Sequence, residues 1–202
     1  MDPAPVNDAR AILDDRFSAR ETAITESRKV IRSSANAIRA LHRGENARAD
    51  DLIHDAGERL AALMSALADH PDIAYAGYSH DASKEYAEAS ITAALFRGEE
   101  PPGFEELGID PVPYLHGLGE AVGEMRRRLL DLLRAGEVEE ASRVLDVMDE
   151  IVDRLAEVDY PDGMTHGLRR TTDVSRSLVE RSRADLTATV VQERLRRDLS
   201  QT

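Results

Sequence analysis

The spacing of apolar residues along this chain follows the period of an α-helix from one end to the other. The clearest case is residues 137–157, where apolar side chains recur three or four positions apart, at Ala141, Val144, Leu145, Met148, Ile151, Val152 and Leu155. Nowhere does the chain alternate apolar and polar residues in the way that a half-buried strand requires. The pattern therefore predicts an all-α protein.

Interruptions of this period predict where the helices end. Gly44 and Gly136 follow the last apolar positions of two segments, and Pro71 interrupts a third. The connectors are short, so neighbouring helices should run antiparallel, and the Pro- and Gly-rich connector 97–113 has room for a short helical turn. We predict a single helical domain over 1–202, with 1–7 and 198–202 frayed. Its fold would be an antiparallel bundle of about six to seven helices, the main ones at 8–43, 46–69, 71–96, 113–134, 137–157 and 164–198.

Three absences narrow the class of protein. There is no cysteine, which excludes disulfides and thiolate metal sites. No apolar run approaches the roughly 20 residues of a membrane span, so we expect no membrane partner. The N-terminal stretch MDPAPVNDARAILDD has neither the basic start nor the apolar centre of a signal peptide, which makes a cytoplasmic location the expectation.

The net charge of −13 argues on its own against a nucleic-acid partner, because phosphates would be repelled. The distribution of charge weakens that argument. Residues 20–43 hold six basic and two acidic side chains, and residues 165–197 hold eight and four, whereas 135–162 hold two and ten. The two ends of the chain therefore offer basic helices to an anionic partner. Arginine supplies 24 of the 26 basic residues, a composition that either a salt-rich cytoplasm or a GC-rich genome produces.

Two pairs of glutamates stand among small side chains. The stretch KEYAEAS, residues 84–90, holds Glu85 and Glu88, and HGLGEAVGEMRRR, residues 116–128, holds Glu120 and Glu124. Residues three or four apart on a helix share a face, so the members of each pair point the same way. Alanines surround the first pair and three glycines surround the second. Since each glycine costs a helix about 1 kcal/mol relative to Ala, we expect close backbone approach or room for a ligand here.

Two carboxylates from each of two facing helices would make an all-oxygen site, which hard cations such as Mg²⁺ or Mn²⁺ prefer. Without a metal the four charges would repel one another, and some would bind protons instead. Such a site indicates phosphodiester chemistry. Two other interpretations stay open. Pairs of this spacing also occur on solvated helix faces, and di-iron bundles use paired carboxylates, although they need Glu-x-x-His on two helices, which this chain lacks.

The same residues carry a resemblance to the translin family, and within it to the catalytic X-type subunit, translin-associated factor X, in its archaeal type. EYAEA, residues 85–89, is similar to that subunit's Glu-Tyr-hydrophobic-Glu-Ala signature. GIDPVPYLHGLGEAVGEMRR, residues 108–127, is similar to its Pro-Val-Asp-Tyr-Leu-x-Gly segment, which continues to an acidic residue and then Gly-Glu. ESRKVIRSSANAIRALHRG (26–44) and GLRRTTDVSRSLVERSRADL (167–186) resemble the first and closing helices, so the resemblance covers most of residues 20–190.

The resemblance implies a Mg²⁺-dependent endoribonuclease that binds single-stranded RNA or DNA and assembles into hollow homo-oligomers, typically octamers. The four acidic residues of the X subunit, which bind the metal and carry catalysis, fall on Glu85, Glu88, Glu120 and Glu124. Glu120 departs from the pattern, since the X subunit tends to carry Asp there. A non-catalytic single-strand-binding oligomer is the alternative function, and a helical scaffold with protein partners only is a third.

Cations near these segments are the predicted nucleic-acid contacts. The third helix of translin is rich in Arg and His, and the corresponding YAGYSHDASKEY offers His80 and Lys84. His116, one turn before Glu120, could touch the metal or the substrate. Structural roles remain the alternative: a surface position for His80, a packing role for His116, and a solvated surface or salt bridges for the arginines. The predicted contacts are His80, Lys84, Arg126, Arg127, Arg28, Lys29 and Arg32.

Overall fold

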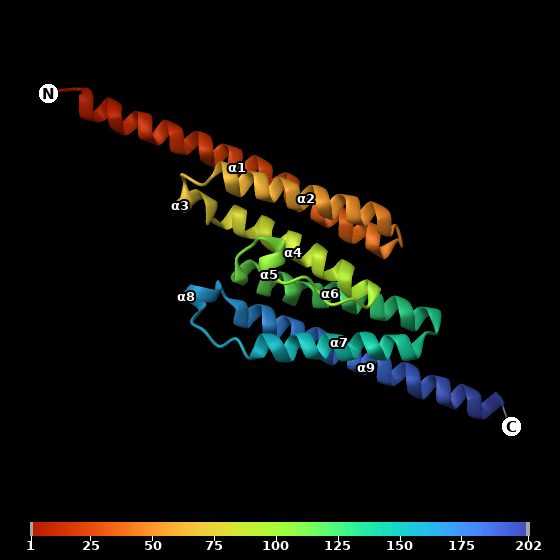
Figure 1. The fold of residues 1–202 in the computed structure, drawn as a ribbon. Coiled ribbons are helices and arrows are strands. Elements are labelled where there is room, and N and C mark those ends of the chain that lie inside the picture. Colours follow the sequence, from red (N-terminus) through yellow and green to blue (C-terminus); the bar gives the residue numbers. More distant parts are fainter. Residues whose placement is uncertain (1, 201–202) are drawn as a thin grey trace.

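The computed structural model describes residues 2–200, and within them the chain forms helices and turns without any strand. The prediction of an all-α fold is confirmed. Six long helices lie side by side, with three single-turn helices in the connections between them (Figure 1). The helices are α1 (Ala4–His42), α2 (Asn46–Ala66), α3 (Pro71–Ala74), α4 (Gly77–Arg97), α5 (Phe104–Leu107), α6 (Pro111–Ala135), α7 (Val138–Ala156), α8 (Asp162–Thr165) and α9 (Leu168–Ser200).

Helices α4 and α6 form the middle of the bundle (Figure 1). On one side α1 and α2 cover them, and on the other side lie α7 and α9. Residues 87–94 of α4 are all buried, so this helix has no solvated face over two turns, as expected for a central helix. Most of these residues are Ala, Ser or Thr, whose small side chains let neighbouring helices approach closely.

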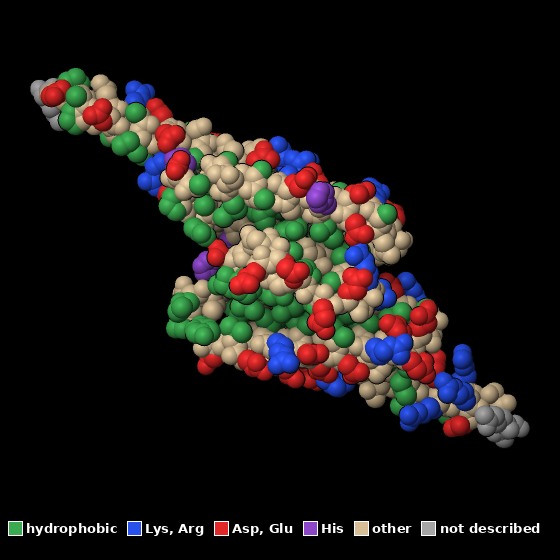
Figure 2. Space-filling model, in the orientation of Figure 1, with side chains coloured by type: hydrophobic (Ala, Val, Ile, Leu, Met, Phe, Trp, Pro, Cys, Tyr) green, Lys and Arg blue, Asp and Glu red, His purple; other side chains and the backbone are tan. Residues whose placement is uncertain are grey.

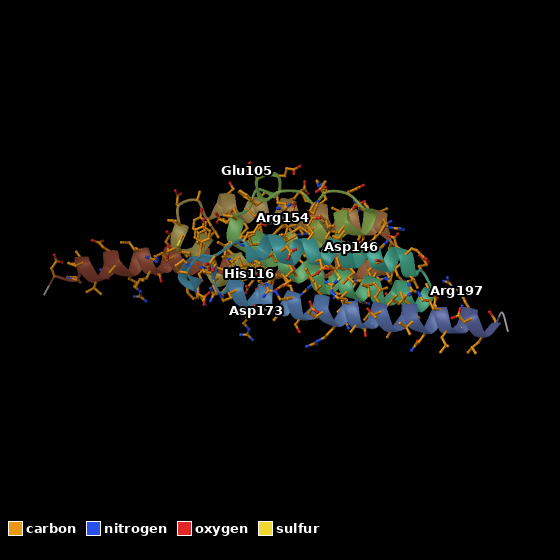
Figure 3. All side chains as sticks on the ribbon, turned by 90° about the horizontal axis from the view of Figure 1, so that it is seen from below. Glu105, His116, Asp146, Arg154, Asp173 and Arg197 are labelled. Atoms are coloured by element: carbon orange, nitrogen blue, oxygen red, sulfur yellow. The ribbon has the colours of Figure 1, made fainter. Side chains whose placement is uncertain are left out.

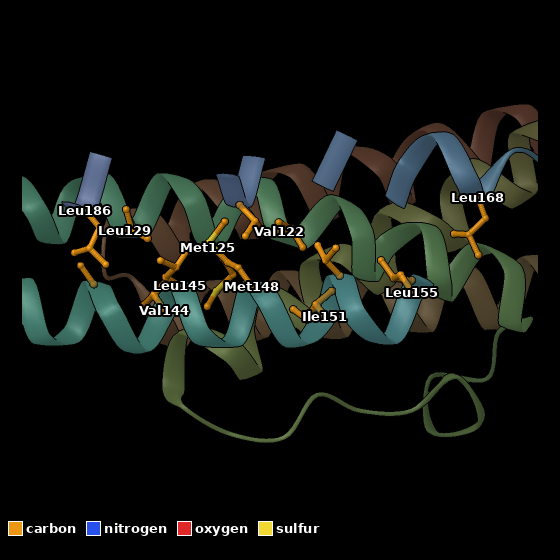
Figure 4. Close-up of a cluster of buried hydrophobic side chains, with 13 residues drawn as sticks. Val122, Met125, Leu129, Val144, Leu145, Met148, Ile151, Leu155, Leu168 and Leu186 are labelled. Atoms are coloured by element: carbon orange, nitrogen blue, oxygen red, sulfur yellow. The ribbon is translucent and has the colours of Figure 1, made fainter. Parts of the chain in front are cut away.

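The larger apolar core lies between α6, α7 and α9 (Figure 4). The seven residues predicted as the apolar stripe of α7 are all buried in it. Met125 and Leu129 of α6 and Leu168 of α9 belong to the same cluster. Burial of each such side chain contributes about 1.5–3 kcal/mol. The core between α6, α7 and α9 therefore fixes α6 in place, and with it the polar residues on the opposite face of that helix.

Two of the predicted helices are in fact broken, and the prediction of continuous helices is wrong at both places. The segment predicted as 71–96 is α3 followed by α4, with Ala76 between them in an extended conformation (φ −74°, ψ 162°). This break turns Ile73 into a buried apolar cluster with α2. The closing segment is α8 followed by α9, separated by His166 (φ 51°) and Gly167 (φ 83°). A residue in the left-handed conformation ends a helix, and two consecutive residues in this conformation separate α8 from α9.

The first part of α1 and the last part of α9 project from the body at opposite ends (Figures 1 and 2). Both carry exposed large apolar side chains, Val6, Leu13 and Phe17 on α1 and Val191 and Leu195 on α9. These apolar side chains have no cover within residues 2–200. No stretch of the described helices combines the length and the low charge that a lipid bilayer demands of a spanning segment.

Candidate metal centre

Three glutamates bring their carboxylates together where α4 meets α6. Glu85 and Glu88 lie one turn apart on α4, and Glu120 reaches them from α6. One carboxylate oxygen of each lies within 4.8 Å of the other two. Oxygen ligands lie about 2.0–2.6 Å from Mg²⁺ or Ca²⁺, so small side-chain rotations suffice for all three to reach one ion. The structure thus brings together three of the four glutamates predicted for a metal site.

The close approach of α4 and α6 depends on a glycine. A Cβ atom at Gly117 would lie 2.8 Å from the Cβ of Ala87 and 2.8 Å from the carbonyl oxygen of Lys84, so any larger side chain would push the helices apart. Gly119 lies on the other side of α6, where a Cβ would be 2.5 Å from the Thr171 side chain on α9. Two of the three glycines therefore serve close helix contacts, and the contact with α4 sets how near the carboxylates come.

Glu88 is the most buried of the three glutamates, with 8% of its surface exposed. Among residues 2–200 no hydrogen bond or ion pair reaches its carboxylate. Burial, together with the negative charges of Glu85, Glu120 and Glu124, raises its pKa to about 8. A cation bound among the three carboxylates would offset the cost of a negative charge on Glu88.

Lys84 contributes a positive charge to this cluster. Its ammonium lies 2.8 Å from Oε1 of Glu120 and 3.3 Å from Oε1 of Glu85. Burial lowers the pKa of Lys84, but the hydrogen bonds and charges of the two carboxylates outweigh burial and hold the pKa above its ordinary value. Burial also raises the pKa of Glu85, an effect that Lys84 reduces without cancelling. The residue predicted as a nucleic-acid contact is thus engaged with the acidic cluster.

Glu124, the fourth predicted glutamate, faces α1 rather than the other three. Its Oε2 lies 2.5 Å from Nε2 of His42, whose side chain is almost fully buried. The His42 ring packs edge-on against Phe96 with 5.1 Å between ring centroids, and the guanidinium of Arg128 lies 4.8 Å from the same Phe ring. Sequence reasoning missed His42, because only the packing of α1 against the α4–α6 pair brings it next to a residue 82 positions away.

His80 lies in a cluster of three histidines, one turn of α4 before Lys84. The centroid of its half-buried ring is 5.7 Å from that of His116 and 4.9 Å from that of His166. Burial, followed by the proximity of His166 and His116, lowers the pKa of His80. A cavity of about 520 Å³ opens beside His80 and His166, at the end of the bundle where α8 meets α9.

His116 has the packing role that was its structural alternative. Its Nε2 lies 2.9 Å from the carbonyl oxygen of Thr165, and its Nδ1 lies 2.9 Å from Oγ1 of Thr171. Both ring nitrogens are therefore engaged, and the side chain ties α6 to α8 and α9. Figure 3 labels His116 among the side chains of the bundle. Neither nitrogen is left to bind a metal ion.

The predicted arginines and Lys29 differ in what they contact. Arg126 donates hydrogen bonds to Oγ of Ser182 and Oδ2 of Asp185, both at 2.8 Å, and so joins α6 to α9. Arg127 is exposed, and Lys29 is exposed on α1, where it pairs with a neighbouring glutamate. Arg126 thus has the structural role of a salt bridge, whereas Arg127 stays accessible.

A basic stripe runs along α1. Arg28, Arg32 and Arg39 are exposed, and their spacing of four and seven residues places them on one face of the helix. The outer face of α7 has the opposite charge (Figure 2), through the exposed side chains of Asp146, Glu150, Asp153 and Glu157. An anionic polymer would therefore approach from the side of α1, not from that of α7.

The chain is similar in sequence and in fold to known proteins. No model of a known protein family matches the chain. An uncharacterized protein of Methanocaldococcus jannaschii is 28% identical over 189 residues, which span 93% of this chain and 83% of that protein. The structure of AfC3PO in complex with duplex RNA superimposes with a TM-score of 0.86 and 32% identity, covering 93% of this chain and 97% of that one. The crystal structure of AfC3PO without RNA gives the same TM-score and identity. Apo-NeC3PO has a TM-score of 0.83 at 19% identity and shares the fold.

Proposed function

Because the chain belongs to the translin family, as its 32% identity to AfC3PO across 93% of its length establishes, we propose that it is a metal-dependent endoribonuclease of the X type. The observation that carries this proposal is the convergence of the Glu85, Glu88 and Glu120 carboxylates, one oxygen of each within 4.8 Å of the other two. An all-oxygen set of this kind suits Mg²⁺ or Mn²⁺. When bound, such an ion would activate a water molecule and stabilise the charge that develops on the phosphate.

The residues of the chain divide the remaining work. Glu85, Glu88 and Glu120 hold the metal, and Gly117 keeps their two helices close enough to do so. Glu124, one turn after Glu120, completes the set of four and is oriented by the ring of His42. These groups lie on elements packed from both sides, which is the rigidity that a catalytic arrangement needs.

RNA is the substrate in this proposal, since AfC3PO was solved with duplex RNA. The basic stripe of α1 (Arg28, Arg32 and Arg39) would hold the phosphate backbone and lead it to the cluster, and His80 and Arg127 would extend the contact. We propose that single-stranded RNA is cleaved, so single-stranded and duplex RNA of one sequence should be compared directly. Contacts of this kind weaken as the salt concentration rises.

We further propose that the protein is a homo-oligomer. The apolar face of the projecting part of α1 has no cover within the described chain, and Leu13 and Phe17 are each more than 60% exposed. A second copy of the chain has the same apolar face on its own projecting helix. Contact between the two faces would remove both from water.

A non-catalytic RNA-binding protein is the second candidate. The ion pairs of Lys84 with Glu85 and Glu120 favour it, because they give two of the carboxylates a structural role without metal. The replacement of the usual Asp by Glu120 is also compatible with lost catalysis.

Cleavage of labelled RNA separates the two candidates. Purified protein would be incubated with single-stranded RNA in high KCl, with Mg²⁺ or with EDTA, as wild type, as Glu85→Ala/Glu88→Ala and as Glu150→Gln. Glu150 is an exposed acid on α7 and serves as the control. We expect cleavage that requires Mg²⁺ and is lost only in the double variant. RNA that is retarded but intact in every lane would instead indicate a binding protein.

A further inference from the structure

The chain contains two lysines, and they are used in opposite ways. Lys29 is exposed on α1 and pairs with Glu26 at 2.7 Å, one turn before it. The side chain of Lys84 is 19% exposed and places its ammonium among the carboxylates, 2.8 Å from Glu120 and 3.3 Å from Glu85. The acidic cluster therefore already holds a cation, and that cation belongs to the chain.

The backbone of α4 places the first atoms of the Lys84 side chain at the interface with α6. The carbonyl oxygen of Lys84 packs directly against Gly117 of α6, which fixes the start of the side chain at the helix interface. Glu85 follows it in the sequence, and Glu120 lies one turn beyond Gly117 on α6. The ammonium is thus held between carboxylates from both helices.

The ammonium and a metal ion would compete for the same oxygens. A divalent ion bound by Glu85 and Glu120 would lie within a few Å of Lys84 in its present position, and like charges that are shielded from water repel strongly at that separation. The lysine side chain has a flexible four-carbon stem, so it can swing away while α4 stays in place.

We propose that Lys84 is the resident counter-ion of this site: it neutralises Glu85 and Glu120 while no metal is bound, and a divalent cation displaces it into solvent. This inference rests on the proposed metal site and adds a function that the family resemblance does not carry. Lys84 lowers the affinity of the site for metal, and its ammonium becomes more accessible once metal has bound.

Metal affinity tests the competition. Binding of Mn²⁺ would be measured by electron paramagnetic resonance for wild type, Lys84→Met, Lys84→Arg and Lys29→Met at one pH and salt concentration. Lys84→Met keeps most of the apolar stem and removes the charge, so we expect tighter binding by roughly three- to tenfold, as loss of a competing ion pair would give. Lys84→Arg and Lys29→Met should stay close to wild type.

The displacement itself has a direct readout, because only two lysine side chains react with acetic anhydride. Mass spectrometry would follow acetylation of each lysine with and without Mg²⁺. Lys84 should react faster when Mg²⁺ is present, and Lys29 should react at the same rate in both. If Mn²⁺ binds wild type and Lys84→Met equally and acetylation of Lys84 does not change, the metal site stands and its counter-ion role is wrong. If no variant binds Mn²⁺, the metal site and this inference fail together.

Discussion

Glu88 makes the stability of the metal-free protein depend on pH. Its pKa is raised from 4.5 to about 8, mainly by burial. Between these values the folded protein holds a proton that the unfolded chain releases, so stability falls as the pH rises through this window. We expect Glu88→Gln, which is neutral at every pH, to match wild type near pH 5 and to melt at a higher temperature at pH 8.5 in EDTA. A gain of about 1 kcal/mol would raise Tm by about 2–4 °C in a chain of this size.

Thermal melting between pH 5 and 8.5 measures this difference, with the exposed Glu105→Gln on α5 as the control. Added Mg²⁺ should stabilise wild type, because a ligand stabilises the folded state that binds it. Glu88→Gln lacks one of the three carboxylates of the proposed site, so Mg²⁺ should leave its melting temperature nearly unchanged. Melting curves of wild type and Glu88→Gln that stay parallel over the whole pH range would show that Glu88 is not the buried acid described here.

His42 is predicted to act through Glu124. Loss of a residue that orients a metal ligand typically lowers activity or metal affinity by about 10–100-fold, and we expect His42→Ala to reduce RNA cleavage by about the lower figure while RNA affinity stays the same. His42→Gln can place an amide nitrogen near the position of Nε2 and should recover part of the rate. Equal losses in both variants would mean that His42 only fills space beside Phe96.

At the level of single residues, the sequence was most informative where helical spacing defines a face. It paired Glu85 with Glu88 and brought attention to Glu120, and these three do meet. The partner of Glu124 was out of reach, because His42 comes from a helix whose packing on α4 and α6 has no local signal in the sequence. Whether these residues bind metal and catalyse remains a prediction.

Among the elements, the contact between α4 and α6 is the one that the site depends on. We expect Gly117→Ala to cost about 1–3 kcal/mol, as overpacking of a close contact does, and to weaken Mn²⁺ binding because the two helices separate. Gly123→Ala is the matched control on the same helix, since its nearest neighbour, Cδ1 of Leu178, would be 3.9 Å away. Higher helix propensity should make that variant equally stable or more stable, by up to about 1 kcal/mol.

Chemical denaturation and Mn²⁺ binding of the two glycine variants would be measured side by side. If Gly117→Ala and Gly123→Ala behave alike in both assays, the close approach of α4 and α6 does not control the site.

The predicted elements failed where tertiary packing decides the backbone. Apolar period and terminal glycines located the long helices within a few residues. The break at Ala76 lies directly before Gly77, the first residue of α4, and it accompanies burial of Ile73 in the cluster with α2. At the second break, His166 adopts the left-handed conformation, which is uncommon for residues other than glycine. The sequence therefore offered no reason to expect a break there, and the apolar period predicted one continuous helix.

For the whole molecule, the exposed apolar surface of α1 predicts self-association. We expect Phe17→Glu to reduce the mass measured by light scattering to that of a smaller species, because a charge on this face has to be buried in the assembly. Tyr160→Glu, at a similarly exposed position before α8, should leave the mass unchanged. An unchanged mass for Phe17→Glu would place the contact between copies elsewhere.

The arrangement of charge also belongs to the whole molecule. Net charge alone argued against a nucleic-acid partner, yet exposed acids gather on the outer face of α7 (Figure 2), whereas Arg28, Arg32 and Arg39 are exposed on α1. Composition could not reveal this separation, whereas helical periodicity together with the packing order of the helices does. We propose that residues 1–202 form one folding unit, since α4 and α6 contact helices from both ends of the chain.

The central claim is that Glu85, Glu88 and Glu120 bind a divalent cation, and anomalous diffraction from crystals soaked in MnCl₂ tests it most directly. We expect an anomalous peak between the three carboxylates, with oxygen atoms at about 2.0–2.6 Å, and with the ammonium of Lys84 moved away from Glu120. No peak between the three carboxylates, with Lys84 still in contact with Glu120 at a Mn²⁺ concentration that saturates other sites, would contradict the metal site and the enzymatic function proposed from it.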